Sequence, residues 1–231
     1  MLPYSTVIFD LDGTLLDTLQ DLADSVNHVL SLHQMPLRSL DEIRQFVGNG
    51  VGLLICRAVP AGTAPDLEAQ CLSEFRAYYA AHMSDHTAPY SGVPELLESL
   101  ARAGIRVAVV SNKFDGAVKG LCRSYFGSLV PVAIGESQGV ARKPAPDTVF
   151  RALAELGAEA GGAVYVGDSE VDIQTARNAG LPCLSVSWGF RDSALLTEQG
   201  AKRIFSSPGA LQAFLLGGQT DEIRPGSQKL L

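Results

Sequence analysis

The chain has 231 residues and is 46% hydrophobic, which is enough for one full hydrophobic core and a smaller accessory domain. Its 25 aspartates and glutamates outnumber 18 lysines and arginines, and the net charge of -7 argues against nucleic acid or an anionic membrane as a partner. No apolar run approaches the roughly 20 residues of a transmembrane helix, and no signal peptide precedes the first strand pattern. We therefore expect a cytoplasmic protein.

The first apolar run, residues 6–11, has the composition of a buried strand, and two acids lie at its end. Asp10 and Asp12 are two positions apart, so in a strand they would share a face at the edge where α/β proteins bind ligands. Two such carboxylates repel each other unless a cation lies between them, and oxygen-only ligands favour Mg²⁺. Asp10 could then act as a nucleophile, and Asp12 as an acid and a base. Taken alone, the string also fits an Asp-rich turn at Gly13.

From residue 18 to residue 82 the apolar spacing is helical throughout, with no strand pattern. Thr18 is the expected N-cap of the first helix, and Ser39 with Glu42 predicts a capping box for the second. We interpret this segment as an inserted antiparallel helical bundle, joined to the rest of the chain by two short linkers that allow a hinge.

After the bundle, short apolar runs alternate with helical patterns. This alternation is typical of a doubly wound, Rossmann-like α/β fold with a parallel sheet. The expected strands cover residues 107–111, 130–134, 163–166 and 183–186, and the expected helices cover 94–103, 116–125, 147–156 and 171–179. The predicted domains are an α/β core (1–16 and 88–216), a helical domain (17–87) and a flexible tail (217–231).

A second group of acids follows the expected strand at residues 163–166. Asp168 lies at the end of that strand, and Asp172 lies one helical turn further on. If this strand is a neighbour of the first one, Asp168 reaches the same crevice and completes a magnesium site, with Asp172 in support. The alternative is that these acids only cap the helix that follows Glu170.

A phosphate group also needs cationic and hydrogen-bonding partners, and two residues could supply them. Ser111 ends the expected strand at residues 107–111, so its hydroxyl and the amides of Asn112 and Lys113 would point at the crevice. Lys143 lies in a loop before a helix. A lone lysine in a loop is usually a solvated surface charge. A role for Lys143 in the site is favoured only because the other predicted site residues are also present.

These elements, in this order, resemble the haloacid dehalogenase superfamily of phosphatases over nearly the whole chain. The resemblance implies a nucleophile, an acid/base, a phosphate-binding hydroxyl and a cation. The nucleophile would be Asp10, and the acid/base would be Asp12. The phosphate-binding hydroxyl would be that of Ser111, and the cation would be Lys143. It also implies Mg²⁺ as cofactor, bound by the carboxylates of Asp10, Asp168 and Asp172 and by the backbone carbonyl of Asp12.

The resemblance further implies that the helical insertion is a mobile cap, which closes over the site and excludes water. Within it, the string around Asn49 resembles the cap loop of phosphoglycolate phosphatases, whose exposed amides suit an anion. Arg57 and Lys113 are candidate partners for a substrate carboxylate. An ordinary turn and a solvent-facing Arg57 are the alternatives. The expected substrate-binding residues are Thr14, Asn112, Lys113, Gly48, Asn49, Gly50 and Arg57.

Together these features predict a magnesium-dependent phosphomonoester hydrolase that converts 2-phosphoglycolate to glycolate and phosphate through an aspartyl-phosphate intermediate. The same core residues would serve a phosphatase for a sugar phosphate, a nucleoside monophosphate or pyrophosphate, or a sugar phosphomutase. Asp12 and Asp168 argue against a dehalogenase, and the presence of Asp10, Asp12 and Lys143 argues against an inactive binding module. We expect a monomer or homodimer whose partner is a small phosphate ester.

Overall fold

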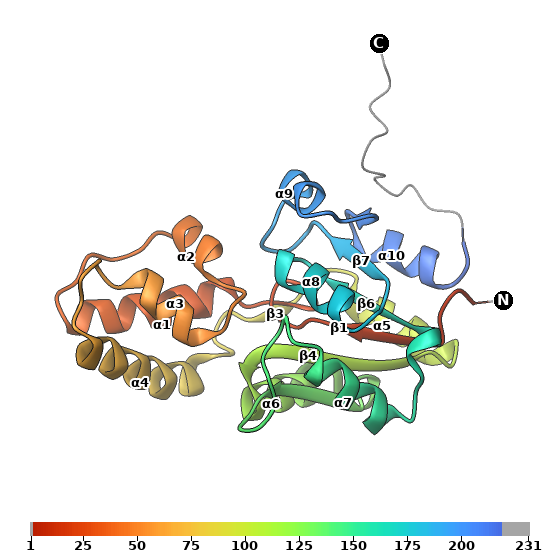
Figure 1. Cartoon of the computed structure of the whole chain (residues 1–231), viewed down its shortest axis with the longest axis horizontal. Coiled ribbons are helices and arrows are strands. Elements are labelled where there is room, and N and C mark those ends of the chain that lie inside the picture. Colours follow the sequence, from red (N-terminus) through yellow and green to blue (C-terminus); the bar gives the residue numbers. More distant parts are fainter. Residues whose placement is uncertain (1, 219–231) are drawn as a thin grey trace, which may run out of the picture. The chain divides into compact units, whose positions relative to one another are not determined.

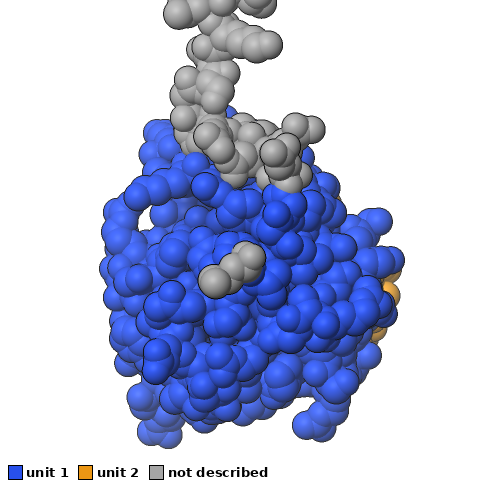
Figure 2. Space-filling view, turned by 90° about the vertical axis from the view of Figure 1, so that its right-hand side faces the viewer, with its two compact units in different colours: residues 1–15, 89–231 blue, residues 16–88 orange. Residues whose placement is uncertain are grey.

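The computed structural model describes residues 2–218 and divides the chain into two compact units (Figures 1 and 2). The first unit contains the chain up to Leu15 and from Pro89 onward, and the second contains Leu16–Ala88. Most of the tail predicted to be flexible, residues 219–231, lies outside the described residues. None of the helices within residues 2–218 has the length and apolar character that crossing a membrane requires.

Within the described residues, the first unit is built around a six-stranded sheet in which every pair of neighbouring strands is parallel. The strand order is β5-β4-β1-β6-β7-β8, so the first strand of the chain lies in the middle. The strands are β1 (Thr6–Phe9), β4 (Arg106–Phe114), β5 (Val132–Glu136), β6 (Ala163–Gly167), β7 (Cys183–Val186) and β8 (Ile204–Phe205). This order confirms the predicted doubly wound parallel sheet.

The helices of this unit cover the sheet. The helices are α5 (Val93–Arg102), α6 (Asp115–Phe126), α7 (Asp147–Leu156), α8 (Glu170–Asn178), α9 (Ser193–Glu198) and α10 (Pro208–Leu215), with short 3₁₀ turns η1 (Gly127–Leu129) and η2 (Ala160–Gly162). Helices α7 and α8 share one core cluster with the sheet, in which Ile8, Val110 and Tyr165 are fully or almost fully buried. Val7 and Phe9, which point to the other face of β1, are equally buried, so both faces of the sheet are covered.

The strand ends differ from the sequence prediction in several places. Strand β1 ends at Phe9 rather than at residue 11, and β6 extends to Gly167. Strand β4 continues three residues beyond Ser111, with a register shift between Val110 and Phe114. The strand expected to begin at residue 130 begins at Val132, after Pro131, which has no N–H to donate to a ladder. Strand β8 was not predicted, because a two-residue strand is too short to produce an alternating pattern. Helices α9 and α10 were not predicted either.

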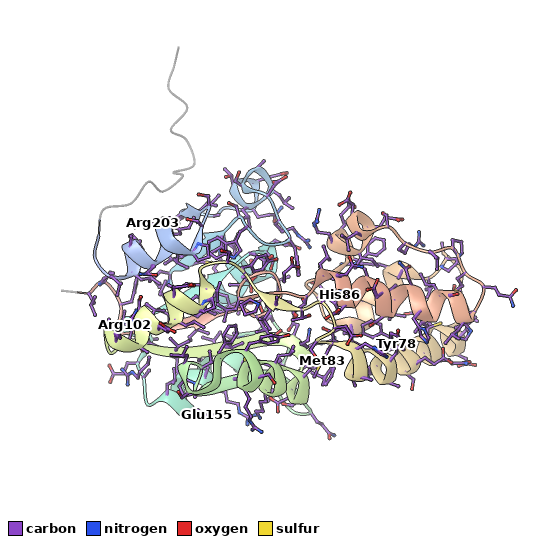
Figure 3. All side chains as sticks on the ribbon, turned by 180° about the vertical axis from the view of Figure 1, so that it is seen from behind. Tyr78, Met83, His86, Arg102, Glu155 and Arg203 are labelled. Carbon is purple, nitrogen blue, oxygen red and sulfur yellow. The ribbon has the colours of Figure 1, made fainter. Side chains whose placement is uncertain are left out.

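The second unit consists of helices joined by short loops (Figure 1). Its helices are α1 (Leu19–Leu32), α2 (Leu40–Phe46), α3 (Val51–Ala58) and α4 (Pro65–His82), and two strands, β2 (Leu16–Asp17) and β3 (Ala88–Pro89), pair at its two ends. The predicted capping box of Ser39 and Glu42 is present. In α4, Tyr78, labelled in Figure 3, stacks between the rings of His28 and His82.

The predicted cap at Thr18 is only partly right. Thr18 occupies the N-cap position of α1, but its hydroxyl has no hydrogen-bond partner within residues 2–218. Asp21, in the first turn of α1, instead accepts hydrogen bonds from the backbone N–H groups of His86 (2.8 Å) and Thr87 (2.9 Å). The carboxylate of Asp21 thus makes a contact with residues more than 60 positions away and does not cap its own helix.

Candidate active site

The pairing of β1 with β6 brings the two acidic motifs together. Phe9 is in register with Val166, so the residues that follow, Asp10 and Asp168, leave the sheet at the same edge. The N–H of Asp10 still donates to the carbonyl of Val166 at 2.9 Å, which continues the ladder to the first carboxylate. The neighbouring position of these strands, on which the prediction for Asp168 depended, is therefore confirmed.

The carboxylates of Asp10, Asp168 and Asp172 are all buried, and one oxygen of each lies within 4.8 Å of the others. Burial raises the pKa of Asp10 well above its ordinary value, and the nearby Asp172 adds to this rise. Burial and Asp172 also raise the pKa of Asp168 to about 7. Such mutual repulsion among oxygen ligands fits a hard divalent cation such as Mg²⁺, which would lower it.

Lys143 supplies a positive charge to this cluster. Its ammonium nitrogen lies 2.9 Å from Oδ1 of Asp10, 2.8 Å from Oδ1 of Asp172 and 3.1 Å from the hydroxyl oxygen of Tyr165. Burial by itself would lower the pKa of this ammonium, but the carboxylates of Asp10 and Asp172 outweigh that effect and raise it. Lys143 therefore stays protonated beside Asp10, and it is not the solvated surface lysine of the alternative interpretation.

Asp172 is fixed by hydrogen bonds on both of its oxygens. Oδ1 accepts from Lys143 and from the hydroxyl of Tyr165 at 3.0 Å, while Oδ2 accepts from the N–H (3.1 Å) and the hydroxyl (2.6 Å) of Ser169. The bonds to Ser169 close the first turn of α8, as the capping interpretation expected. The bonds to Lys143 and Tyr165 go beyond capping, because they connect α8 to the charge cluster.

Asp168 is held by the turn that follows β1 and by the loop that follows β7. Its Oδ1 accepts from the hydroxyl of Thr14 (3.1 Å), and its Oδ2 accepts from the N–H of Phe190 (2.7 Å). Gly189 lies so close that an added Cβ would be 2.6 Å from Oδ2 of Asp168 and would collide with the carbonyl oxygen of Gly13. The absence of a side chain at Gly189 therefore allows this loop to approach Asp168.

A second cluster joins β4 to the Asp12 turn. The ammonium of Lys113 lies 2.7 Å from Oδ1 of Asp12, and the hydroxyl of Ser111 donates to Oδ2 of Asp12 at 3.5 Å. The N–H of Lys113 donates in turn to the Ser111 hydroxyl oxygen at 3.2 Å. The Lys113 side chain is almost fully buried, so the structure directs this lysine at Asp12, the residue expected to act as acid and base.

The nine predicted residues of the first unit thus all take part in hydrogen bonds or ion pairs at the site. Asn112 does so through two hydrogen bonds between its side chain and the backbone of Lys143. The predicted cap residues belong to the second unit. Gly48 and Gly50 have positive φ angles of 114° and 84°, and Gly50 directly precedes α3. Arg57 is exposed and donates to the carbonyl of Phe46 at 2.7 Å. Contact of these cap residues with a substrate stays a prediction.

Tyr165 and Phe190, which contact the acids, were not among the residues predicted from the sequence. Tyr165 lies in an otherwise apolar strand, and a buried hydroxyl needs a partner, so its position in the sequence was a usable signal. The N–H of Phe190 offered no such signal, because any residue carries a backbone N–H. Only the packing of the loop after β7 directs it at Asp168.

Comparisons with family models, with curated proteins and with solved structures all find hydrolases similar to this chain. The family model described as haloacid dehalogenase-like hydrolase matches residues 7–186. The chain is 36% identical over 220 residues to the phosphoglycolate phosphatase of Rhodospirillum rubrum, with 90% of each protein covered. It is 35% identical over 198 residues to that of Caulobacter vibrioides, covering 84% of this chain and 83% of that protein. A solved structure from Lactobacillus delbrueckii subsp. bulgaricus matches with a TM-score of 0.89 at 33% identity, over 94% of this chain and 100% of that one.

Proposed function

The chain belongs to the haloacid dehalogenase-like hydrolase family, and we propose that it is a magnesium-dependent phosphomonoester hydrolase that carries the phosphoryl group on Asp10. The observation that carries this proposal is the buried contact between Oδ1 of Asp10 and the ammonium of Lys143 at 2.9 Å, beside the carboxylates of Asp168 and Asp172. The residues proposed as nucleophile, cation and metal ligands are thus close to one another.

We assign the metal site to Asp10, Asp168, Asp172 and the backbone carbonyl of Asp12. Support comes from the donor set, which is all oxygen, and from the raised pKa values of Asp10 and Asp168. Mg²⁺ bound there would offset the negative charge that gathers when an anionic phosphate approaches these carboxylates.

In the first half of the proposed reaction, a carboxylate oxygen of Asp10 attacks the phosphorus of the ester. The bond from phosphorus to the leaving oxygen breaks, and Asp12 donates a proton to that oxygen. The hydroxyl of Ser111 and the ammonium of Lys143 donate hydrogen bonds to the phosphoryl oxygens, whose charge is redistributed during the transfer. The products of this half are a free alcohol and an aspartyl phosphate.

In the second half, Asp12 is ionised and accepts a proton from a water molecule that attacks the aspartyl phosphate. This step releases inorganic phosphate and restores the carboxylate of Asp10. The contact with the ammonium of Lys113, at 2.7 Å, supports this role because it fixes the side chain of Asp12 beside the site.

For the substrate we propose 2-phosphoglycolate, which would be hydrolysed to glycolate and phosphate. Two phosphoglycolate phosphatases are 36% and 35% identical to this chain over the aligned residues, which supports this choice. The glycine-rich entry to α3 and the cations Arg57 and Lys113 provide candidate groups for a substrate carboxylate. The second candidate function is hydrolysis of another small phosphate through the same Asp10 chemistry.

The test is phosphate release from a panel of 2-phosphoglycolate, sugar phosphates, nucleoside monophosphates and pyrophosphate, with Mg²⁺ and then with excess chelator. We expect release that requires Mg²⁺ and has its highest kcat/KM for 2-phosphoglycolate. A higher kcat/KM for another phosphate ester would be consistent with the Asp10 mechanism but would contradict 2-phosphoglycolate as the substrate. Isomerisation of a sugar phosphate with little phosphate release would favour a phosphomutase instead.

A further inference from the structure

We propose that Asn112 is a positioning residue, which fixes the backbone of Lys143 and thereby the place of its ammonium beside Asp10. This inference rests on the proposed function, because it concerns how two phosphate-binding groups are brought into register. It assigns the side-chain amide of Asn112 to a contact within the protein.

The geometry is a two-bond clamp between the end of β4 and the loop before α7. Nδ2 of Asn112 donates to the backbone carbonyl of Lys143 at 3.0 Å, and the backbone N–H of Lys143 donates to Oδ1 of Asn112 at 2.8 Å. Both residues are buried, at 6% and 5% exposure. Buried hydrogen bonds of this kind are costly to break, because the groups left behind lose both partner and water.

The clamp matters because Lys143 has no regular structure around it. The stretch from residue 137 to residue 146 lies between β5 and α7, outside any strand or helix, so no sheet ladder fixes this backbone. Its neighbours Arg142 and Pro144 are exposed. Asn112 directly follows Ser111, and its clamp therefore sets the distance between the hydroxyl and the ammonium proposed to bind the same phosphoryl group.

A second asparagine holds the same loop from its other side. Nδ2 of Asn178, the last residue of α8, donates to the carbonyl of Pro144 at 2.7 Å. Asn178 is exposed, whereas Asn112 is buried. The loop that carries Lys143 is thus attached both to β4 and to α8, the helix that carries Asp172. Since Lys143 contacts Asp172, both attachments favour one position of the ammonium.

The first experiment measures the clamp without any substrate. In the full-length protein, Asn112→Ala is expected to increase the amide hydrogen exchange rate of Lys143, because its N–H loses the Oδ1 acceptor. We expect kcat to fall on the order of 10- to 100-fold, the range found when support of a catalytic group is removed. Unchanged exchange at the Lys143 amide would overturn the proposal, whatever happens to activity.

The chain offers a matched control in the second unit. Nδ2 of Asn27 donates to the backbone carbonyl of Arg38 at 2.9 Å, and the N–H of Arg38 donates to Oδ1 of Asn27 at 2.8 Å, which is the same two-bond arrangement. Asn27→Ala is expected to lower Tm and leave kcat unchanged. If Asn112→Ala lowers kcat only in proportion to a comparable loss of folded protein, the positioning role is wrong.

A double-mutant cycle separates positioning from direct substrate contact. The affinity for inorganic phosphate is measured in wild type, Asn112→Ala, Lys143→Ala and the double variant, each first checked for folding by circular dichroism. If Asn112 acts through Lys143, its replacement weakens phosphate binding in the wild type and has no further effect once Lys143 is alanine. An equal effect in both backgrounds would instead assign the Asn112 side chain to the phosphate.

These readouts also distinguish the failure of the two proposals. A wild-type protein that releases no phosphate from any ester would contradict the proposed function, while the exchange rate of the Lys143 amide would still report the clamp. Conversely, if the wild type releases phosphate and the exchange rate of the Lys143 amide is unchanged in Asn112→Ala, the positioning role of Asn112 is wrong. The proposed phosphatase function would then be unaffected.

Discussion

At the scale of single residues, the site is a balance of buried charge. The carboxylates of Asp10, Asp168 and Asp172 repel one another, and Lys143 offsets part of that repulsion through short contacts to two of them. Because these groups are shielded from solvent, each interaction is stronger than it would be at the surface. Replacing one of these residues is therefore expected to affect its neighbours as well.

The nucleophile gives the most direct prediction. Asp10→Asn keeps the shape of the side chain and removes the negative charge that attacks phosphorus, so we expect phosphate release to fall below detection while the far-UV circular dichroism spectrum is retained. Asp66→Asn, at an exposed aspartate of α4, is the matched control and should retain full turnover. Unchanged turnover in Asp10→Asn would contradict the mechanism.

The pKa of Asp168 predicts how Mg²⁺ stabilises the protein at different pH values. In the metal-free protein this pKa is about 7, whereas in the unfolded chain it would be about 3.9. Between these values the folded state holds a proton that the unfolded state has lost, so the contribution of Asp168 to stability falls as the pH rises. Mg²⁺ must displace that proton, and we expect the rise in Tm on adding Mg²⁺ to be larger at pH 7 than at pH 5.

Thermal unfolding with Mg²⁺ or with chelator, at both pH values, measures this difference. Asp168→Asn is the control, because it removes this titrating group and should reduce the difference between the two pH values. A Tm increase of the same size at pH 5 and pH 7 would contradict the assignment of Asp168 as a metal ligand that competes with protons.

At the scale of elements, the loop after β7 packs against Asp168 and donates a hydrogen bond to it. Gly189→Ala would place a methyl group against the carbonyl oxygen of Gly13 and the carboxylate of Asp168. Overpacking of this kind typically costs about 1–3 kcal/mol, and the loop would have to move away from Asp168. We expect a lower Tm and a weaker apparent affinity for Mg²⁺, measured by activity against Mg²⁺ concentration.

Gly209→Ala is the control for this substitution. Gly209 lies in α10, and an added Cβ would meet no atom within 4 Å, so alanine should leave Mg²⁺ affinity unchanged and keep or slightly raise Tm. If Gly189→Ala behaved like Gly209→Ala, the close approach of the loop to Asp168 would have no functional meaning.

At the scale of the whole molecule, the residues proposed for catalysis and most of those proposed for substrate selection lie in different units. The first unit contains the acids, Ser111 and Lys143, while the second contains Arg57 and the glycine-rich entry to α3. We therefore expect changes in the second unit to alter the choice of substrate more than the chemistry on Asp10.

Arg57→Ala tests this division. If Arg57 binds a substrate carboxylate, its loss should lower kcat/KM for 2-phosphoglycolate on the order of 10-fold and leave kcat/KM for a phosphate ester without a carboxylate nearly unchanged. Arg44→Ala, in α2 of the same unit, is the control and should change neither value. An equal loss for both esters would assign Arg57 to the structure of the loop, through its bond to Phe46.

The bounds of several elements and the positions of most site residues along the chain follow from the sequence alone. Helix α7 and strand β7 have the bounds that the local pattern predicts, and Asp10, Asp12, Ser111 and Asp168 stand where expected strands end. These features are local, because hydrophobic periodicity and strand ends are properties of a few consecutive residues. The tertiary structure decided which strands are neighbours, which partners Tyr165 has, and how Asn112 meets Lys143. Those contacts join residues far apart in the chain, and only the order of strands in the folded sheet brings them within hydrogen-bond distance.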